Sequence, residues 1–113
     1  MDKQRRRDIT QAYKDRKVPV GIFSLRCDAT GETWLGASRN LDGAANGALF
    51  GLRMGSGRNR DLQAAWTAHG EGAFTYGVVE TLEADMTPIG RETWLKERLR
   101  HWIAALEGHP LVP

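Results

Sequence analysis

The chain has 113 residues, of which 41% are hydrophobic and 27% charged, and its formal net charge is +2 at pH 7; this length predicts one domain with a modest core. No apolar run approaches the ~18 residues that a membrane-spanning helix needs, and no apolar segment follows the charged N-terminus, so we expect neither a membrane partner nor a signal peptide. The single cysteine, Cys27, excludes an internal disulfide and is typical of a reducing, cytoplasmic location.

The charge is unevenly distributed along the chain. Residues 1–19 hold seven Lys or Arg and three Asp, a net charge of +4, whereas residues 20–113 hold nine basic and eleven acidic side chains. A basic N-terminal arm over residues 1–17 is compatible with contact to a nucleic acid, for which Lys14 and Lys17 are candidates, and equally with a solvated polar helix. The domain itself is predicted over residues 18–107, followed by a C-terminal tail over residues 108–113.

Residues 19–38 predict a β-hairpin. The segments "VGIFSLR" and "TWLGAS" are short and rich in β-forming residues, and "DATGE" between them supplies Gly31 for a turn. The next segment, residues 41–55, predicts a helix with Asp42 as its N-cap and Leu41, Ala45, Leu49 and Leu52 as its apolar stripe.

That helix also carries a glycine at every fourth position from residue 43 to residue 55. Interior glycines weaken a helix and leave one of its faces bare, where another backbone can approach closely. Two interpretations remain open at this point. The face is a docking surface for a protein partner or a second copy in a homodimer, or the helix packs tightly on a neighbouring element of its own domain.

The remaining elements complete an α+β fold. Asn59 predicts the N-cap of a helix that stops at Gly70, "AFTYGVVETL" predicts a third strand, and residues 91–108 predict a long last helix that stops at Gly108. Together they predict a small, largely antiparallel three-stranded sheet flanked by helices.

Two short motifs resemble a known family. Gly21-Ile22-Phe23, followed after ten residues by Trp34-Leu35-Gly36, looks like the two signature strands of the GIY-YIG nucleases, and residues 52–82 are similar to the stretch that follows in that family. The resemblance covers residues 18–106. It implies a GIY-YIG-like fold, a DNA partner and, in an active member, phosphodiester hydrolysis that depends on a divalent metal such as Mg²⁺ or Mn²⁺.

The resemblance also implies where the functional residues would stand. The two signature tyrosines correspond to Phe23 and Trp34, the arginine to Ala44, and the metal-binding glutamate to Leu99. Phe23 has no hydroxyl, and the indole of Trp34 can only donate a hydrogen bond, so neither can accept a proton. We therefore predict a DNA-associated domain that is catalytically degenerate or atypical. The alternative is a protein-interaction module that keeps the nuclease fold without catalysis.

Nearby residues are the candidates to replace the missing groups. Arg39 and Arg53 are candidates for the arginine, and Glu92 and Glu97 for the metal ligand. At about 100° per residue, Glu97 lies opposite the apolar face of the last helix and Glu92 lies at its edge. For contact with backbone phosphates, we expect a cluster on the loop between the two middle helices, formed by Arg53, Arg58 and Arg60. Surface solvation remains the alternative role for each of these arginines.

Overall fold

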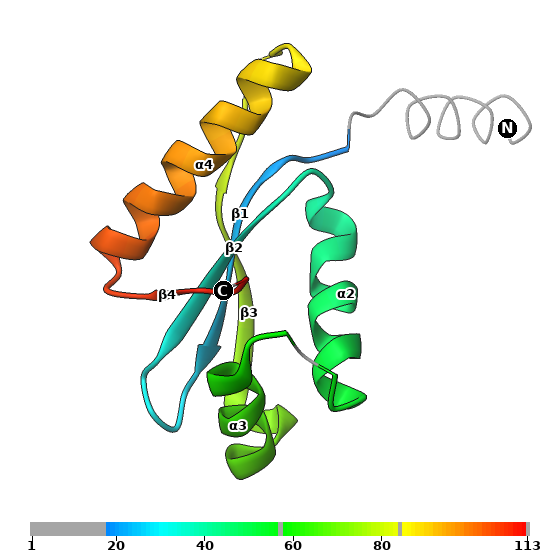
Figure 1. Ribbon diagram of the computed structural model, residues 1–113, viewed down its shortest axis with the longest axis vertical. Coiled ribbons are helices and arrows are strands. Elements are labelled where there is room, and N and C mark those ends of the chain that lie inside the picture. The colour runs from blue at the N-terminus through cyan, green and yellow to red at the C-terminus, as the bar shows by residue number, and fades with distance from the viewer. Residues whose placement is uncertain (1–17, 57, 84, 113) are drawn as a thin grey trace, which may run out of the picture.

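The computed structural model describes residues 18–56, 58–83 and 85–112, so the predicted arm with Lys14 and Lys17 lies outside the described residues. The elements, in chain order, are β1 (Gly21–Cys27), β2 (Thr33–Ser38), α2 (Leu41–Arg53), α3 (Arg60–His69), the short 3₁₀ helix η1 (Glu71–Ala73), β3 (Phe74–Thr81), α4 (Pro88–Ala105) and β4 (His109–Pro110). Helix α4 lies on one side of the sheet, and α2 and α3 lie on the other (Figure 1). The predicted α+β class is confirmed.

The sheet has four strands rather than the three predicted. Their order is β3-β1-β2-β4, with β1 antiparallel to both of its neighbours and β4 parallel to β2. Strand β4 lies in the segment predicted as a tail, where the Leu111 amide donates to the Leu35 carbonyl at 2.7 Å. A two-residue strand has no alternating pattern, and for this reason the sequence does not reveal it.

The two glycines of the signature strands lie where neighbouring atoms come very close. A Cβ added at Gly21 would lie 2.0 Å from the Glu80 carbonyl oxygen, beside the register irregularity of β1 and β3 at Ile22/Phe23. Gly36 lies opposite Phe23, and its Cβ would lie 2.6 Å from Cζ of that ring. The spacing of glycines and aromatic residues therefore has a structural reason, whatever the chemistry of the domain.

The core is divided between the two faces of the sheet because successive strand residues point to opposite sides. Six buried residues lie between the sheet and α2 and α3, and four lie between the sheet and α4. Cys27 belongs to the first cluster as a free, fully buried thiol. The first cluster is Leu25, Cys27, Trp34, Leu52, Leu62 and Trp66, and the second is Val20, Ile22, Leu35 and Leu95.

Helix α2 begins at Leu41, two residues earlier than an Asp42 cap would allow. The N-cap is Asn40, whose side-chain oxygen accepts a hydrogen bond from the Gly43 amide at 3.1 Å, while Asp42 lies in the first turn. The predicted Asp42 cap is therefore wrong by two positions. Both residue types can cap, and the sequence alone does not decide between them. The Asn59 cap predicted for α3 is confirmed, since its side chain accepts from the Leu62 amide.

The glycine face of α2 is bare within the described chain. A Cβ at Gly47 or Gly51 would meet no atom of another element within 4 Å, so no neighbouring element of the described chain packs tightly on these two glycines. None of the helices in the described ranges is long and apolar enough to cross a bilayer.

Candidate functional site

Two of the residues proposed as substitutes meet in the folded chain. Arg39 follows the end of β2, and Glu92 lies near the start of α4, 53 positions later. Nε and Nη2 of Arg39 both contact Oε1 of Glu92. The two side chains are 66% and 41% exposed, so the pair faces solvent and a ligand can reach it.

Helix α4 explains why Glu92 reaches this position and Leu99 does not. Leu95 is buried against the sheet and Leu99 packs against the same apolar cluster. Glu92 precedes Leu95 by about one helical turn, and its side chain is 41% exposed. A carboxylate at Leu99 would be buried among apolar side chains, which is costly for a charged group. Glu97 is exposed, in agreement with helical geometry.

The donors at Glu92 set a limit on what cation could bind there. Within residues 18–112, apart from the two positions that are not described, no group of three or more His, Cys, Asp or Glu side chains could hold a metal ion. Magnesium, however, is commonly bound by one or two carboxylates together with water and substrate phosphates. A cation at Glu92 would therefore need a phosphate and water to complete its coordination shell, and the one partner that the described part of the chain gives this carboxylate is Arg39.

Phe23 and Trp34, which stand at the signature tyrosine positions, are part of the core. Phe23 is 5% exposed and stacks on Tyr76 with ring centroids 5.7 Å apart. Trp34 is 1% exposed and packs against Phe74 and His109. Both rings stabilise the domain by packing, and neither carries a group that could take a proton.

Tyr76 is a polar group beside Phe23 that sequence reasoning missed. It lies on β3 opposite Leu25, and its hydroxyl donates to the Leu41 carbonyl at the start of α2 at 3.4 Å. Burial and the nearby Asp42 carboxylate raise the pKa of Tyr76. The phenol therefore stays protonated near neutral pH and acts as a donor. The signal was the alternation of Phe74, Tyr76 and Val78, which places their side chains on the same side of β3.

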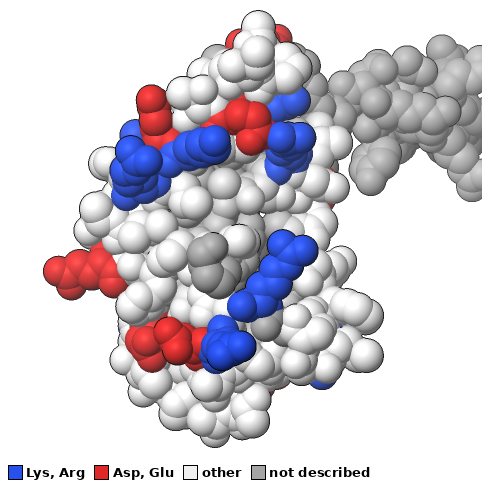
Figure 2. Space-filling model, in the orientation of Figure 1, with Lys and Arg blue, Asp and Glu red and all other residues white. Residues whose placement is uncertain are grey.

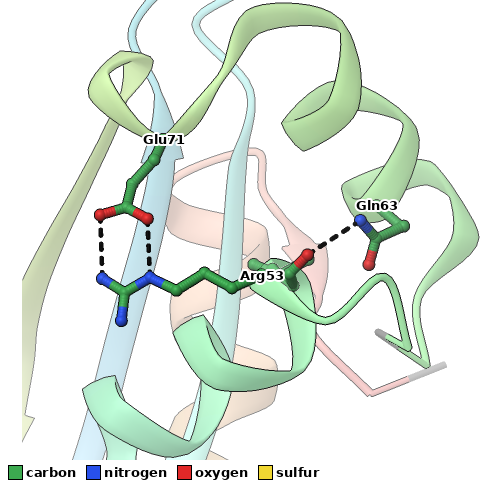
Figure 3. Close-up of polar contacts among 4 residues, drawn as sticks. Arg53, Gln63 and Glu71 are labelled. Carbon is green, nitrogen blue, oxygen red and sulfur yellow. Dashed lines mark hydrogen bonds and ion pairs between the residues drawn. The ribbon is translucent and has the colours of Figure 1, made fainter.

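Arg53 is engaged by a neighbouring carboxylate. Its Nε and Nη2 donate to Oε1 and Oε2 of Glu71 at 2.7 and 2.9 Å, a bidentate pair that joins α2 to η1 (Figure 3). The same hydrogen bonds lower the pKa of Glu71 and raise the pKa of Arg53. Beside this pair, the Gln63 side chain donates to the Leu52 carbonyl and fixes α3 against the end of α2 (Figure 3). Arg53 thus has a structural role in addition to any contact with phosphate.

The predicted cluster of three arginines is divided by this arrangement. Arg58 and Arg60 are exposed and line a cavity of about 460 Å³ at the start of α3, and Arg53 is not among its lining residues. Glu32 and Asp61 line the same cavity, which is therefore mixed in charge. Basic and acidic side chains also lie next to one another across the face shown in Figure 2.

Solved structures with a similar fold are known. No protein-family model and no curated protein matches the chain. The catalytic domain of the homing endonuclease I-TevI matches with a TM-score of 0.69 and 18% identity over 83% of this chain and 99% of that one. A point mutant of the catalytic domain of the intron endonuclease I-TevI matches with the same TM-score and identity, over 81% and 92% of the two chains. At this identity the likeness confirms the GIY-YIG-like fold and leaves the activity of this chain to be tested.

Proposed function

We propose that this domain acts on DNA as a nuclease-like domain with an atypical reaction centre formed by Arg39 and Glu92. The observation that carries the proposal is the contact of these two side chains, which come from distant parts of the sequence. Support comes also from the fold, which is similar to the catalytic domain of an endonuclease. In this proposal Arg39 and Glu92 replace the groups missing at Ala44 and Leu99.

Each residue would have a distinct role. Glu92 would hold a divalent cation, Mg²⁺ or Mn²⁺, which when bound supplies positive charge to the phosphate and lowers the pKa of a coordinated water. The Arg39 guanidinium would donate to a phosphate oxygen and stabilise the negative charge that develops on it. Phe23 and Trp34 would keep the two central strands in place.

The test is cleavage of supercoiled plasmid and of branched DNA in the presence of Mg²⁺ or Mn²⁺. We expect metal-dependent nicking that is lost in Glu92→Gln and kept in Glu97→Gln. The second variant is a matched control because it removes the same charge from the exposed side of the same helix. Equal activity in the two variants would contradict the role of Glu92, and a wild-type chain that binds DNA without cutting it would leave a degenerate nuclease domain.

A second candidate function is a protein-interaction module that uses α2. Phe50 of α2 and its C-cap residue Met54 are 65% and 66% exposed, and Gly47 and Gly51 of the same helix are bare. Exposed apolar groups of this size are typical of docking surfaces. Light scattering after size exclusion separates the two functions. A stable dimer that is lost in Phe50→Ser and has no affinity for DNA supports the module, whereas a monomer that binds DNA contradicts it.

A further inference from the structure

The cavity at the start of α3 lies away from the Arg39–Glu92 pair and has the size of a small-ligand pocket. Its volume is about 460 Å³, within the range of roughly 300–1,000 Å³ that is typical of such pockets. Glu32, which lines it, precedes β2, and Arg39 follows the end of that strand. At about 3.3 Å per residue, the stretch between them spans roughly 20 Å. The cavity is therefore separate from the proposed reaction centre.

Two arginines of this cavity are left without a partner in the described part of the chain. Arg58 and Arg60 are exposed, and neither forms an ion pair with a described residue, although two carboxylates line the same cavity. Arg53, by contrast, is held by Glu71. A guanidinium without an internal partner remains available to donate to an anion, and phosphate oxygens fit its planar fork of donors.

The two carboxylates of the cavity limit what the anion can be. The Asp61 carboxylate forms no ion pair or side-chain hydrogen bond with the described residues, and the Glu32 carboxylate lies with Oε2 3.5 Å from Nε2 of His109. Such a lining suits a ligand that carries hydrogen-bond donors as well as negative charge. A nucleotide whose base has an exocyclic amino group is a ligand of this kind, because a carboxylate accepts from that group.

His109 supplies a ring on which a base can stack. It lies on β4, and its side chain lines the cavity and is 51% exposed. Its ring packs against the buried Trp34 with ring centroids 5.7 Å apart, and this contact fixes its position. Histidine is among the aromatic side chains on which unpaired bases stack when proteins bind single-stranded nucleic acids.

We infer that this cavity binds one unpaired nucleotide of a DNA strand, with its base stacked on His109 and its phosphates bound by Arg58 and Arg60. Each nucleotide within a strand has a phosphate on either side, one for each arginine. Glu32 and Asp61 accept from the amino group of the base. A base in a duplex uses that group for pairing and is covered by its neighbours, so the bound nucleotide is an unpaired one. The inference rests on the proposed function for its DNA partner.

The first test compares a labelled duplex that has one unpaired cytosine with the same duplex without it, by fluorescence anisotropy of the full chain in a metal chelator. The wild-type chain should bind the first about 5-fold or more tightly, since stacking one base contributes at least that much. His109→Ala should lose this preference. His109→Phe should keep it, because both variants lose the contact to Glu32 and only the second retains a ring.

His101→Ala, which removes an exposed imidazole from α4, is the control and should behave like the wild-type chain. The inference is overturned if the wild-type chain binds the two duplexes equally. It is overturned also if His109→Ala keeps the preference or His109→Phe loses it.

The second test replaces the unpaired cytosine by thymine, which has no amino group. The wild-type chain should bind the cytosine duplex about 5-fold or more tightly than the thymine duplex. The ratio should approach one in the double variant Glu32→Ala, Asp61→Ala and stay unchanged in the double variant Glu83→Ala, Glu97→Ala, which removes two exposed carboxylates elsewhere. Equal binding of the two duplexes by the wild-type chain would contradict the role given to the carboxylates of the cavity.

Two further outcomes separate this inference from the proposed function. A chain that binds none of the duplexes contradicts the proposed function itself. A chain that nicks DNA only with the Glu92 carboxylate, yet does not distinguish the duplex with an unpaired nucleotide, keeps the proposed function and contradicts the inference alone. Free dCMP that binds as tightly as the cytosine duplex would make the cavity a site for a small nucleotide and contradict its assignment to a DNA strand.

Discussion

Gly21 lies where β3 comes closest to β1, and its missing side chain has a measurable consequence. In Gly21→Ala the new Cβ would lie 2.0 Å from the backbone carbonyl oxygen of Glu80, which cannot move without disturbing the pairing of the two strands. We expect a loss of about 2–3 kcal/mol in the free energy of unfolding, measured in urea, since overpacking a close contact costs about that much.

Gly47→Ala is the control for this substitution, and its effect should have the opposite sign. Its Cβ would meet no other atom of the described chain, and the residue lies inside α2. Alanine should therefore stabilise the domain by about 0.5–1 kcal/mol. The structural explanation of Gly21 would be contradicted if both substitutions changed stability in the same direction.

Single residues also show where sequence reasoning reaches its limit. The hairpin of β1 and β2 follows from two adjacent β-forming segments and a turn, and the sequence predicted it; the pairing of Phe23 with Gly36 within it comes from the structure. The contact of Arg39 with Glu92 depends on how α4 crosses the sheet, which no local pattern encodes. Both residues were candidates on chemical grounds, but only the folded chain shows that they meet.

Asn59 joins two elements, and its two roles can be separated by substitution. Its side-chain oxygen accepts from the Leu62 amide as the cap of α3, and its side-chain nitrogen donates to the Pro110 carbonyl at 2.9 Å and to the Leu111 carbonyl at 3.3 Å. Asn59→Ser keeps a capping oxygen and removes the donor to the strand β4 segment.

We expect Asn59→Ser to cost about 1 kcal/mol in the free energy of unfolding, through the lost hydrogen bonds. Hydrogen exchange at single amides shows which of the two roles of Asn59 is lost. The Leu111 amide, which donates to the Leu35 carbonyl, should exchange faster, while the Leu62 amide keeps its protection. Equal acceleration at the two amides would mean that the cap, rather than the link to β4, was damaged.

Glu80 fixes α4 to the sheet through a charge. Its Oε1 accepts hydrogen bonds from Arg98 at 2.6 Å and from Trp102 at 2.9 Å, and these bonds lower the pKa of Glu80. A carboxylate whose pKa is lower in the folded than in the unfolded chain stabilises the fold above its unfolded pKa of about 4.3. That contribution is lost as the pH falls through the folded pKa.

Glu80→Gln should therefore lose about 1–2 kcal/mol of stability at pH 7, because hydrogen bonds to a charged acceptor are replaced by weaker ones. The difference from the wild-type chain should shrink as the pH is lowered below about 4. Thermal unfolding from pH 7 to below pH 4 measures this difference in stability. Glu83→Gln, which removes an exposed carboxylate, is the control. A difference that stays constant with pH would show that packing, rather than the charge, holds α4.

At the scale of elements, the sequence predicted the longer strands and the helices and missed the fourth strand, β4. The longer strands and the helices were found because each has a period that repeats over several residues. Strand β4 was missed because its two residues depend on the approach of Gly108 to β2, where an added Cβ would lie 2.4 Å from Cδ1 of Leu35. Such a contact is decided by the whole fold rather than by the segment.

For the whole molecule, charge is the property that bears most directly on a DNA partner. The net charge is only +2, and basic side chains lie beside acidic ones over the face shown in Figure 2. A surface of this kind provides little general attraction to DNA, so affinity would depend on a few defined contacts. Arg58 and Arg60, which line one cavity at the start of α3, are the predicted phosphate contacts that the fold brings together.

The number of phosphate contacts can be measured from the salt dependence of the affinity for DNA. Each phosphate neutralised by a cation contributes about −0.9 to the slope of log affinity against log salt concentration. If both arginines contact phosphates, the double variant Arg58→Gln, Arg60→Gln should reduce the steepness of that slope by about 2. Removing the same charge from the exposed residues Lys96 and Arg100 of α4 should change it little. Equal slopes in the two double variants would place the DNA elsewhere, because only a local contact distinguishes one pair of cations from the other.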